Sequence, residues 1–415
     1  MKKVMIKKSL VFFIILLFIS LSFSCITGIK TSKKSNYNSE KLANLLEDDT
    51  LDSDIKLLMK LGDIPSCSAC IIKNDSVVWS RGYGYYDRIY NPIRRKKASD
   101  DTIYKIGSIS KSITASAVMQ LYERGLFDLD DNVSEYLPFD LKNPKYPDVN
   151  ITLRMLLAHQ SSLLDHNEMN STTYLFSNYP YSYIKEIILP DGEDYHPEFW
   201  ADYPPGTKAN YSNFGLILIG YLLEELTGQT LEEYCRENIF NPLKMRNTSF
   251  DVDKLDREYL SSHFLRFAGV YIQLPYMDFV FIDPCGGLQS TTEDLSHFLI
   301  AHMNGGVYKN NRILNDSTVE LMHTVQYPNN KSNNLQFGLG WLIMKSSSIT
   351  YEGHNGDLFF FHSIMRQISN DTGVIFCFNS DVTRPRMKQR ILPFIRRLIA
   401  PGLIFDLLIN KAEKI

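Results

Sequence analysis

Apolar and polar residues alternate near both ends of the chain, and apolar residues recur at helical spacing between these ends. Residues 67–73 and 76–82 predict two strands joined by a tight turn at Asn74-Asp75. Strand patterning returns toward the C-terminus at residues 337–344, 363–369 and 372–379. Between the strands, apolar residues at three- and four-residue steps predict helices at residues 106–126, 152–157, 213–227, 231–240 and 292–303.

This order of elements predicts an α+β fold, arranged as an α/β sandwich. Strands at both termini favour one antiparallel sheet built from the two ends of the chain and flanked by helices. The central residues would then form a large, mostly helical inserted lobe. Residues 384–399 predict a basic amphipathic helix. We assign residues 51–400 to one domain and 401–415 to a C-terminal tail, whose apolar part is expected to dock on the sheet, with membrane contact as the alternative.

The first 25 residues predict an export signal. Four of the first eight residues are lysine, and no charged residue follows from Ser9 to Ile26. The alternative is a retained membrane anchor, because about 18 uncharged residues approach the length that spans a bilayer. Cys25 is a candidate for lipidation, which would tether the protein to a membrane. Residues 26–50 are mostly polar and predict a linker, so we expect an exported protein of the cell envelope or one that is secreted.

Composition narrows the classes of function. The formal net charge is −3, with an isoelectric point near 6.3, which argues against nucleic-acid binding because such proteins carry a basic excess. Cys67 and Cys70 have the spacing of a redox or zinc motif, but residues three apart on a strand point to opposite faces. We therefore expect small buried side chains at these two positions, and neither a metal nor a cofactor.

The sequence Ser-Ile-Ser-Lys that begins at Ser108 is the first candidate for chemistry. Residues three apart on a helix share a face, so Lys111 is expected beside the Ser108 hydroxyl. A serine hydroxyl is a weak nucleophile until a base takes its proton. A lysine amine can act as that base only in its neutral form, which burial favours. The spacing alone is weak evidence, because it recurs at residues 53–56 and 182–185.

Two further motifs follow along the chain. Tyr211 offers a phenol that can shuttle a proton, and Asn213 offers an amide that can bind a substrate carbonyl and the lysine. His354 and Gly356 predict a strand that forms one wall of a cleft, where the glycine lets a substrate backbone lie close. A backbone N–H of this strand could join that of Ser108 as an oxyanion hole. A purely structural role is the alternative for this single histidine.

In this order, the three motifs resemble the signature of serine β-lactamase-like hydrolases. That family includes class C β-lactamases, low-molecular-weight penicillin-binding D,D-peptidases, D-amino-acid-specific peptidases and related esterases. Its pattern is Ser-x-x-Lys, then Tyr-x-Asn, then Lys-Thr-Gly or His-x-Gly, which fall here at residues 108, 211 and 354. The resemblance covers about residues 60–400 and includes framing stretches at 101–107, 126–137, 151–162, 205–207, 241–245 and 286–298. It implies a β-lactamase/transpeptidase-like fold.

The resemblance also implies roles for the first two motifs. Ser108 would be the acylated nucleophile, and Lys111 and Tyr211 would move protons. Asn213 would bind the substrate. The sequence departs from the family at Ser162 and at residue 244, a lysine, where glycine is common.

The third motif would supply the opposite wall of the site. His354 would stand in for the family's lysine, Gly356 would lie against the substrate, and the amide of Asp357 would complete the oxyanion hole. An acidic side chain at Asp357 is unfavourable for a substrate carboxylate, unless it points away from the cleft as alternate strand residues do. The aromatic residues 359–361 would narrow the cleft.

The sequence therefore predicts a serine hydrolase that acts through an acyl-enzyme. Its substrate would be an ester or amide of a small-molecule or peptide-like compound. The departures favour an esterase or a D-amino-acid peptidase over a true β-lactamase. The alternative is a catalytically slow penicillin-binding protein, or a sensor or scaffold protein of the cell envelope.

Overall fold

The computed structural model describes residues 51–88, 91, 93–165, 179–267, 270–274, 276, 280–328, 335–345, 350–358, 360–380 and 391–414. The expected export signal, the lipidation candidate Cys25 and the polar linker lie outside these residues. Among the helices of the described ranges, none has the length and apolar character needed to cross a bilayer.

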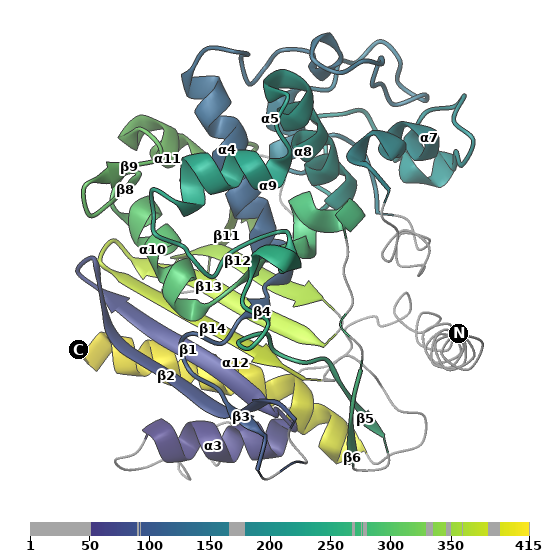
Figure 1. Cartoon of the computed structure of the whole chain (residues 1–415). Helices are drawn as coiled ribbons and strands as arrows, with labels where there is room; N and C mark the ends of the chain where they lie inside the picture. Colours follow the sequence, from purple (N-terminus) through teal and green to yellow (C-terminus); the bar gives the residue numbers. More distant parts are fainter. Residues whose placement is uncertain are drawn as a thin grey trace.

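An eight-stranded antiparallel sheet joins the two ends of the chain (Figure 1). β1 (Ser66–Lys73) pairs with β14 (Thr372–Asn379) along its whole length. The strand order is β10-β11-β12-β13-β14-β1-β2-β3. The other strands of this sheet are β2 (Ser76–Asp87), β3 (Lys96–Lys97), β10 (Leu335–Phe337), β11 (Leu342–Lys345), β12 (Thr350–Leu358) and β13 (Phe361–Ser369). The fold class expected from the sequence is confirmed.

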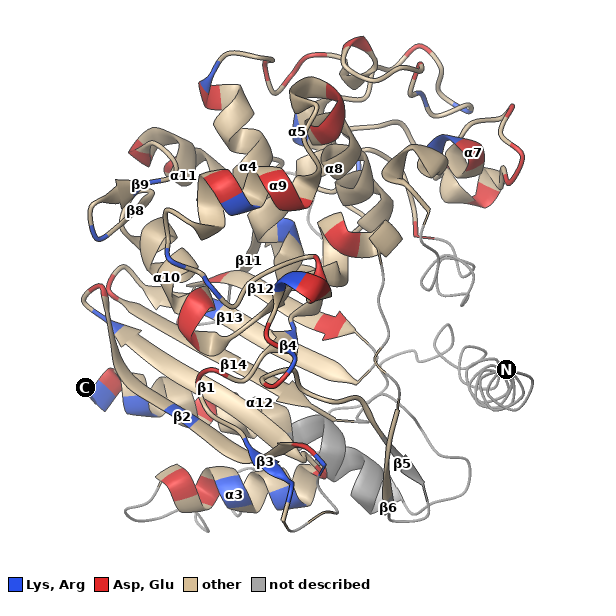
Figure 2. Ribbon diagram, in the orientation of Figure 1, with Lys and Arg blue, Asp and Glu red and all other residues tan. Residues whose placement is uncertain are grey.

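Helices cover both faces of the sheet (Figure 1). α3 (Leu51–Gly62) and α12 (Ile391–Lys414) pack on one face, where they bury Ile55, Leu58, Ile404 and Leu408. Charged residues of both signs lie along α3 (Figure 2), so its apolar stripe faces the sheet and its polar stripe faces water. The other face carries the helical lobe: α4 (Ser110–Glu123), α5 (Leu153–Leu157), α7 (Ile184–Ile188), α8 (Asn213–Thr227), α9 (Leu231–Cys235), α10 (Thr292–Met303) and α11 (Asp316–His323).

Three short strand pairs lie outside the main sheet in the described part of the chain. They are β4 (Tyr104–Lys105) with β7 (Gln289–Ser290), β5 (Phe264–Phe267) with β6 (Val270–Gln273), and β8 (Val307–Tyr308) with β9 (Asn311–Arg312). The pairing of β4 with β7 places the residues just before Ser108 against the segment that leads into α10.

The cysteines of β1 behave as the strand pattern predicts. Cys67 belongs to the apolar cluster shared with α3 and α12, whereas Cys70 belongs to the cluster on the lobe side. Both are buried free thiols, and burial raises the pKa of each well above its ordinary value. Their sulfurs therefore share no site, and the expectation of small buried side chains is confirmed.

Several predicted elements differ from the structure in their boundaries. The helix expected at residues 106–126 is a 3-10 turn at Gly107–Ile109 followed by α4. The single strand expected at residues 337–344 is divided into β10 and β11, because the chain reverses where the Gly338 N–H bonds the Trp341 carbonyl at 2.9 Å. The helices expected at 213–227 and 292–303 are confirmed to the residue.

The C-terminal helix is longer than its pattern suggests. α12 runs to Lys414 and contains Pro401, where the sequence predicts the start of a tail. Proline usually ends a helix because it removes one backbone hydrogen bond and crowds the preceding turn. Here Ile404, Leu408 and Ala412 are fully buried against the sheet and α3, and this burial favours continuation of the helix. The expected docking of the tail on the sheet is confirmed.

At two positions where the family commonly has glycine, this chain has another residue but adopts the left-handed backbone conformation that glycine favours. Ser162 has φ 61° and Lys244 has φ 59°, both in the left-handed region. Such a conformation costs a residue with a Cβ roughly 1–2 kcal/mol. At Ser162 the hydroxyl accepts a hydrogen bond from Asn143 Nδ2 at 2.9 Å, which offsets part of that cost. The substitutions therefore change side chains without changing the path of the chain.

Candidate active site

Lys111 holds its amine beside the Ser108 hydroxyl at the start of α4. Ser108 lies in the 3-10 turn before the helix, and Lys111 lies in the first helical turn. Their Nζ and Oγ atoms are 2.9 Å apart, and Lys111 is fully buried. The copy of this spacing at residues 53–56 lies in α3, on the opposite face of the sheet, and the copy at 182–185 lies at the start of α7.

Two carbonyl oxygens also accept hydrogen bonds from the Lys111 amine. Asn213 Oδ1, on the first residue of α8, lies 2.6 Å from Nζ. The main-chain carbonyl of Cys285 lies at the same distance, 2.6 Å, within the π-helical turn Asp283–Gly287. Carbonyl oxygens can only accept, so they hold two N–H groups of the amine. A neutral Lys111 would therefore direct its lone pair at Ser108.

Tyr211 packs against the same amine. Its ring centroid lies 4.9 Å from Lys111 Nζ. Burial raises the pKa of the Tyr211 phenol, and the opposing effects of Lys111 and Ser108 are smaller. The phenol therefore keeps its proton at neutral pH and can relay it, while a permanent phenolate is disfavoured.

His159 supports the loop that carries Tyr211. Its ring lies 4.4 Å from the Tyr211 ring and 4.9 Å from the Phe337 ring. Its Nδ1 atom accepts a hydrogen bond from the Ser212 amide at 3.1 Å. Burial, with Lys111 nearby, lowers the pKa of His159 to about 3, so the ring is a neutral acceptor. The sequence placed His159 within a family-like stretch but assigned it no role.

Asp165 is a site residue that the sequence did not indicate. Its Oδ1 accepts a hydrogen bond from the main-chain N–H of Asn213 at 2.7 Å. Its Oδ2 accepts one from the side-chain Nδ2 of Asn213, also at 2.7 Å. Burial raises the pKa of this carboxyl to about 6, against the lowering effect of the bonds from α8 and of Lys111. Asp165 lies far from Asn213 in sequence and follows no motif. Only the contact between its loop and the start of α8 reveals it.

β12 forms the wall that carries His354. The ring is 2% exposed, and its centroid lies 6.0 Å from that of Tyr211. Its Nδ1 lies 2.6 Å from the Asn355 carbonyl, which can only accept, so the proton is on Nδ1. Burial, with Lys111 nearby, lowers the pKa of His354 well below its ordinary value. His354 is therefore neutral and does not reproduce the charge of the lysine for which it stands.

The next residues of β12 lie against the turn that carries Ser108. A Cβ on Gly356 would come within 1.8 Å of the Ile106 carbonyl oxygen, so only glycine fits there. A Cβ on Gly107 would come within 2.8 Å of the Asp357 nitrogen. The Asp357 amide thus lies beside the Ser108 turn, as the resemblance implies.

The Asp357 side chain lies on the other side of the strand. Its Oδ1 is 2.6 Å from His362 Nδ1 on β13, and the side chain is 71% exposed. The His362 ring stacks on Phe378, which belongs to the cluster shared with α3 and α12. Of the two orientations considered for Asp357, the structure adopts the one that points away from the His354 face.

Phe360 and Phe361 do not narrow the site in the way the sequence suggested. Phe361 is 1% exposed and packs in the main core, with its ring 4.8 Å from that of His263. Phe360 is also buried, and residue 359 lies outside the described ranges. These rings are held by core packing because strand alternation and the turn into β13 direct them inward.

A family model described as Beta-lactamase matches residues 51–393 of the chain. The chain therefore belongs to the β-lactamase family. Protein flp from Staphylococcus aureus (strain COL) is 27% identical over 321 residues, which are 76% of this chain and 59% of that protein. Beta-lactamase-like protein 2 from Dictyostelium discoideum is 29% identical over 328 residues, which are 76% of this chain and 56% of the relative. The chain thus spans a little over half the length of these curated relatives.

Solved structures share the fold over most of the chain. The octameric penicillin-binding protein homologue from Pyrococcus abyssi has a TM-score of 0.64 and 26% identity, over 86% of this chain and 77% of that one. The D-amino acid amidase from Ochrobactrum anthropi SV3 has a TM-score of 0.66 and 21% identity. The match covers 87% of this chain and 99% of the amidase. The expected β-lactamase/transpeptidase-like architecture is confirmed.

Proposed function

We propose that the chain is a serine hydrolase that forms an acyl-enzyme on Ser108. The observation that carries this proposal is the arrangement of three oxygens around the Lys111 amine. Asn213 Oδ1 and the Cys285 carbonyl, each at 2.6 Å, can only accept, whereas the Ser108 hydroxyl at 2.9 Å can also donate. Of these three oxygens, only that of Ser108 can therefore give a proton to neutral Lys111.

The reaction follows in two half-steps. Ser108 Oγ attacks the substrate carbonyl carbon as its proton passes to Lys111, and the bond to the leaving group breaks as that group receives a proton through the Tyr211 phenol. Water then attacks the acyl carbonyl carbon, the bond from that carbon to Ser108 Oγ breaks, Oγ receives a proton from the water, and the carboxylic acid product leaves. The amides of Ser108 and Asp357 hold the carbonyl oxygen as negative charge develops on it. The close approach of the Asp357 nitrogen to Gly107 supports this last assignment.

The substrate we propose is a neutral ester or amide of a small-molecule or peptide-like compound. The neutral His354 ring supports this choice, because a buried neutral imidazole does not attract a substrate carboxylate as a lysine would. An esterase or a D-amino-acid peptidase therefore fits better than a true β-lactamase. The likeness in fold to a D-amino acid amidase supports hydrolysis of an acyl compound in general terms.

A fluorophosphonate probe tests the nucleophile. We expect labelling of the wild-type chain and none of Ser108→Ala. Ser182→Ala is the matched control, because it removes a serine from another Ser-x-x-Lys sequence, and it should label like the wild type. The Lys111→Ala variant should give the circular dichroism spectrum of the wild type, and its rate of labelling should fall by at least about a hundredfold. Equal labelling of Ser108→Ala and wild type would exclude the proposal.

A substrate panel tests the reaction class. We expect steady turnover of p-nitrophenyl esters or D-amino-acid anilides, and slower hydrolysis of nitrocefin. A burst of one product equivalent followed by no turnover would instead identify the slow penicillin-binding, sensor or scaffold protein. Turnover of nitrocefin above that of every neutral substrate would contradict the proposed substrate class.

We further propose that the protein is exported and held at the cell envelope or secreted. The lysine-rich start followed by the uncharged stretch to Ile26 supports this proposal. Cell fractionation and N-terminal sequencing of the mature protein test it. Recovery of the intact chain, starting at Met1, from the cytoplasm would contradict it.

A further inference from the structure

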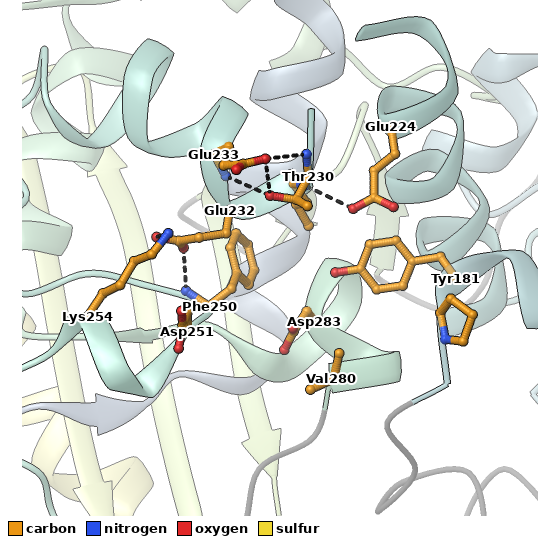
Figure 3. A pocket seen from close by; sticks show the side chains of 12 residues that line it. Tyr181, Glu224, Thr230, Glu232, Glu233, Phe250, Asp251, Lys254, Val280 and Asp283 are labelled. Atoms are coloured by element: carbon orange, nitrogen blue, oxygen red, sulfur yellow. Dashed lines mark hydrogen bonds and ion pairs between the residues drawn. The ribbon is translucent and has the colours of Figure 1, made fainter. Parts of the chain in front are cut away.

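A cavity of about 330 Å³ lies in the helical lobe and shares no lining residue with the candidate active site (Figure 3). Its walls come from the end of α8, the start of α9, the segment from Phe250 to Lys254, and the residues Tyr181 and Asp283. Leu231, Phe250 and Val280 make part of the lining apolar. The cavity therefore combines polar and apolar walls.

The polar lining is strongly acidic. It contains one lysine, Lys254, and five carboxylate residues: Glu224, Glu232, Glu233, Asp251 and Asp283. Lys254 Nζ lies 3.6 Å from Glu232 Oε1, which also pairs with Arg236 at 2.6 Å. The positive charge of Lys254 is thus paired with Glu232 on one side of the cavity. Glu224 and Asp283 lie on the other side, with Tyr181 (Figure 3).

Tyr181 directs an unpaired hydroxyl into this acidic side. The residue is only 7% exposed, and Figure 3 shows its hydroxyl pointing into the space between Glu224 and Asp283. Within the part of the chain that the structure describes, this hydroxyl makes no hydrogen bond. The hydroxyl is therefore available to hydrogen-bond a polar group bound in the cavity.

The carboxylates that line the cavity indicate that a bound polar group would carry a positive charge. Burial, together with the carboxylates of Asp283 and Glu224, raises the pKa of the Tyr181 phenol well above its ordinary value. Burial and the neighbouring Glu225 and Glu233 likewise raise the pKa of the Glu224 carboxyl, although its Oε1 accepts the Leu231 amide at 3.0 Å. Neighbouring carboxylates thus disfavour a charged Glu224, and a cation beside it would relieve that repulsion, while the Tyr181 phenol stays neutral and can accept a hydrogen bond.

We propose that this cavity binds the ammonium group of a small alkylamine, held by the Glu224 and Asp283 carboxylates and the Tyr181 hydroxyl oxygen. An ammonium has three N–H donors, which match these three oxygen-bearing side chains. The apolar wall of Leu231, Phe250 and Val280 would cover the methylene groups of the amine. Among the described residues, no three His, Cys, Asp or Glu side chains are arranged to hold a metal ion, so an organic cation is the better match.

Titration calorimetry of the full chain with n-butylammonium chloride tests this proposal. We expect saturable binding to one site, and no binding of n-butanol, which has the same alkyl chain without the charge. Glu224→Gln and Asp283→Asn should each weaken binding by at least about tenfold, and Tyr181→Phe by about threefold to tenfold. Glu198→Gln is the matched control, because it changes an exposed carboxylate of the same lobe outside the cavity, and it should leave affinity unchanged.

Three outcomes would overturn the site. They are absence of saturable binding to a wild-type chain shown to be folded, equal binding of n-butanol, and unchanged affinity in both Glu224→Gln and Tyr181→Phe. Tyr181→Phe preserves the ring, so it keeps the test valid if a carboxylate variant fails to fold. Ser108→Ala should bind the amine as the wild type does. Loss of binding in that variant would place the amine at the active site and reject the cavity.

Discussion

Asp165 determines which end of the Asn213 amide faces Lys111. The carboxylate can only accept, so the amide nitrogen of Asn213 turns toward Asp165 Oδ2 at 2.7 Å. The amide oxygen of Asn213 then faces Lys111 Nζ at 2.6 Å. The Asp165 carboxylate thus orients a hydrogen-bond partner of the Lys111 amine through Asn213, and this effect needs no contact between Asp165 and Ser108.

Replacement of Asp165 by asparagine should therefore impair catalysis through Asn213. The side-chain NH2 of the new asparagine would replace Oδ2 and face the NH2 of Asn213, and two donors cannot form a hydrogen bond. The Asn213 side-chain amide would therefore rotate and turn its oxygen away from Lys111. We expect kcat to fall by about 10- to 100-fold with little change in KM. Asp202→Asn, an exposed carboxylate of the same lobe, is the control and should retain wild-type rates.

The pH profile distinguishes this positioning role from simple damage to the fold. The pKa of Asp165 is about 6, whereas the pKa of His159 is about 3 and that of His354 is well below the ordinary value. Wild-type kcat should fall as pH decreases through about 6, because protonated Asp165 loses an acceptor. The Asp165→Asn variant should lack this acid limb. An unchanged limb in the variant would contradict the assignment.

Asp294 should make the free energy of unfolding depend on pH. It accepts bonds from the Asn247 amide at 2.7 Å and the Thr248 hydroxyl at 2.8 Å, but burial is the larger effect and raises its pKa to about 6. A raised carboxyl pKa favours the folded state below the unfolded pKa of about 4, and this contribution is lost as pH rises through about 6. Urea unfolding from pH 4 to 7 should show a shallower decline in stability for Asp294→Asn than for the wild type. Parallel curves would contradict this prediction.

Lys244→Gly should stabilise the protein. Lys244 is exposed and adopts φ 59°, a conformation that strains a residue with a Cβ. Relief of that strain exceeds the added chain entropy of glycine, so we expect a gain of up to about 1 kcal/mol in the free energy of unfolding. Arg246→Gly, two residues later at an exposed position with ordinary φ, should destabilise or have no effect. Thermal unfolding of both variants measures the difference.

His354→Lys should shift the substrate preference toward carboxylate-bearing compounds. The variant adds an amine to the wall where the native ring is neutral, and a charge-assisted bond to a carboxylate is worth about 1.4 kcal/mol or more. We expect the rate of acylation by benzylpenicillin, relative to a neutral ester, to rise roughly tenfold. His362→Lys is the control, because its ring lies on the opposite face of the sheet, and it should leave the ratio unchanged.

Asp357→Asn tests the orientation of that side chain. The carboxylate is 71% exposed and pairs with His362, away from the His354 face. Only its main-chain amide adjoins the Ser108 turn. We therefore expect kcat/KM for a neutral ester to stay within about threefold of the wild type. A tenfold change would place the charge in the site and contradict the geometry described above.

The sequence by itself determined the sheet formed from both termini, the helices at residues 213–227 and 292–303, and the order of the three motifs. These features depend on local periodicity and on residue types at fixed spacing, which a chain displays without folding. The neighbourhood of Lys111 was only partly accessible in this way. Ser108 follows from helical geometry, whereas the Cys285 carbonyl is a main-chain atom whose position no side-chain pattern records.

Only the tertiary structure decided which distant groups meet. Asp165 reaches Asn213 because a loop packs on the start of α8, and such a contact has no sequence period. The direction of Asp357 and the burial of Phe361 depended on strand register, since a shift of one residue exchanges the two faces. The neutrality of His354 likewise arose from burial beside Lys111, a property of the packed site and not of the histidine itself.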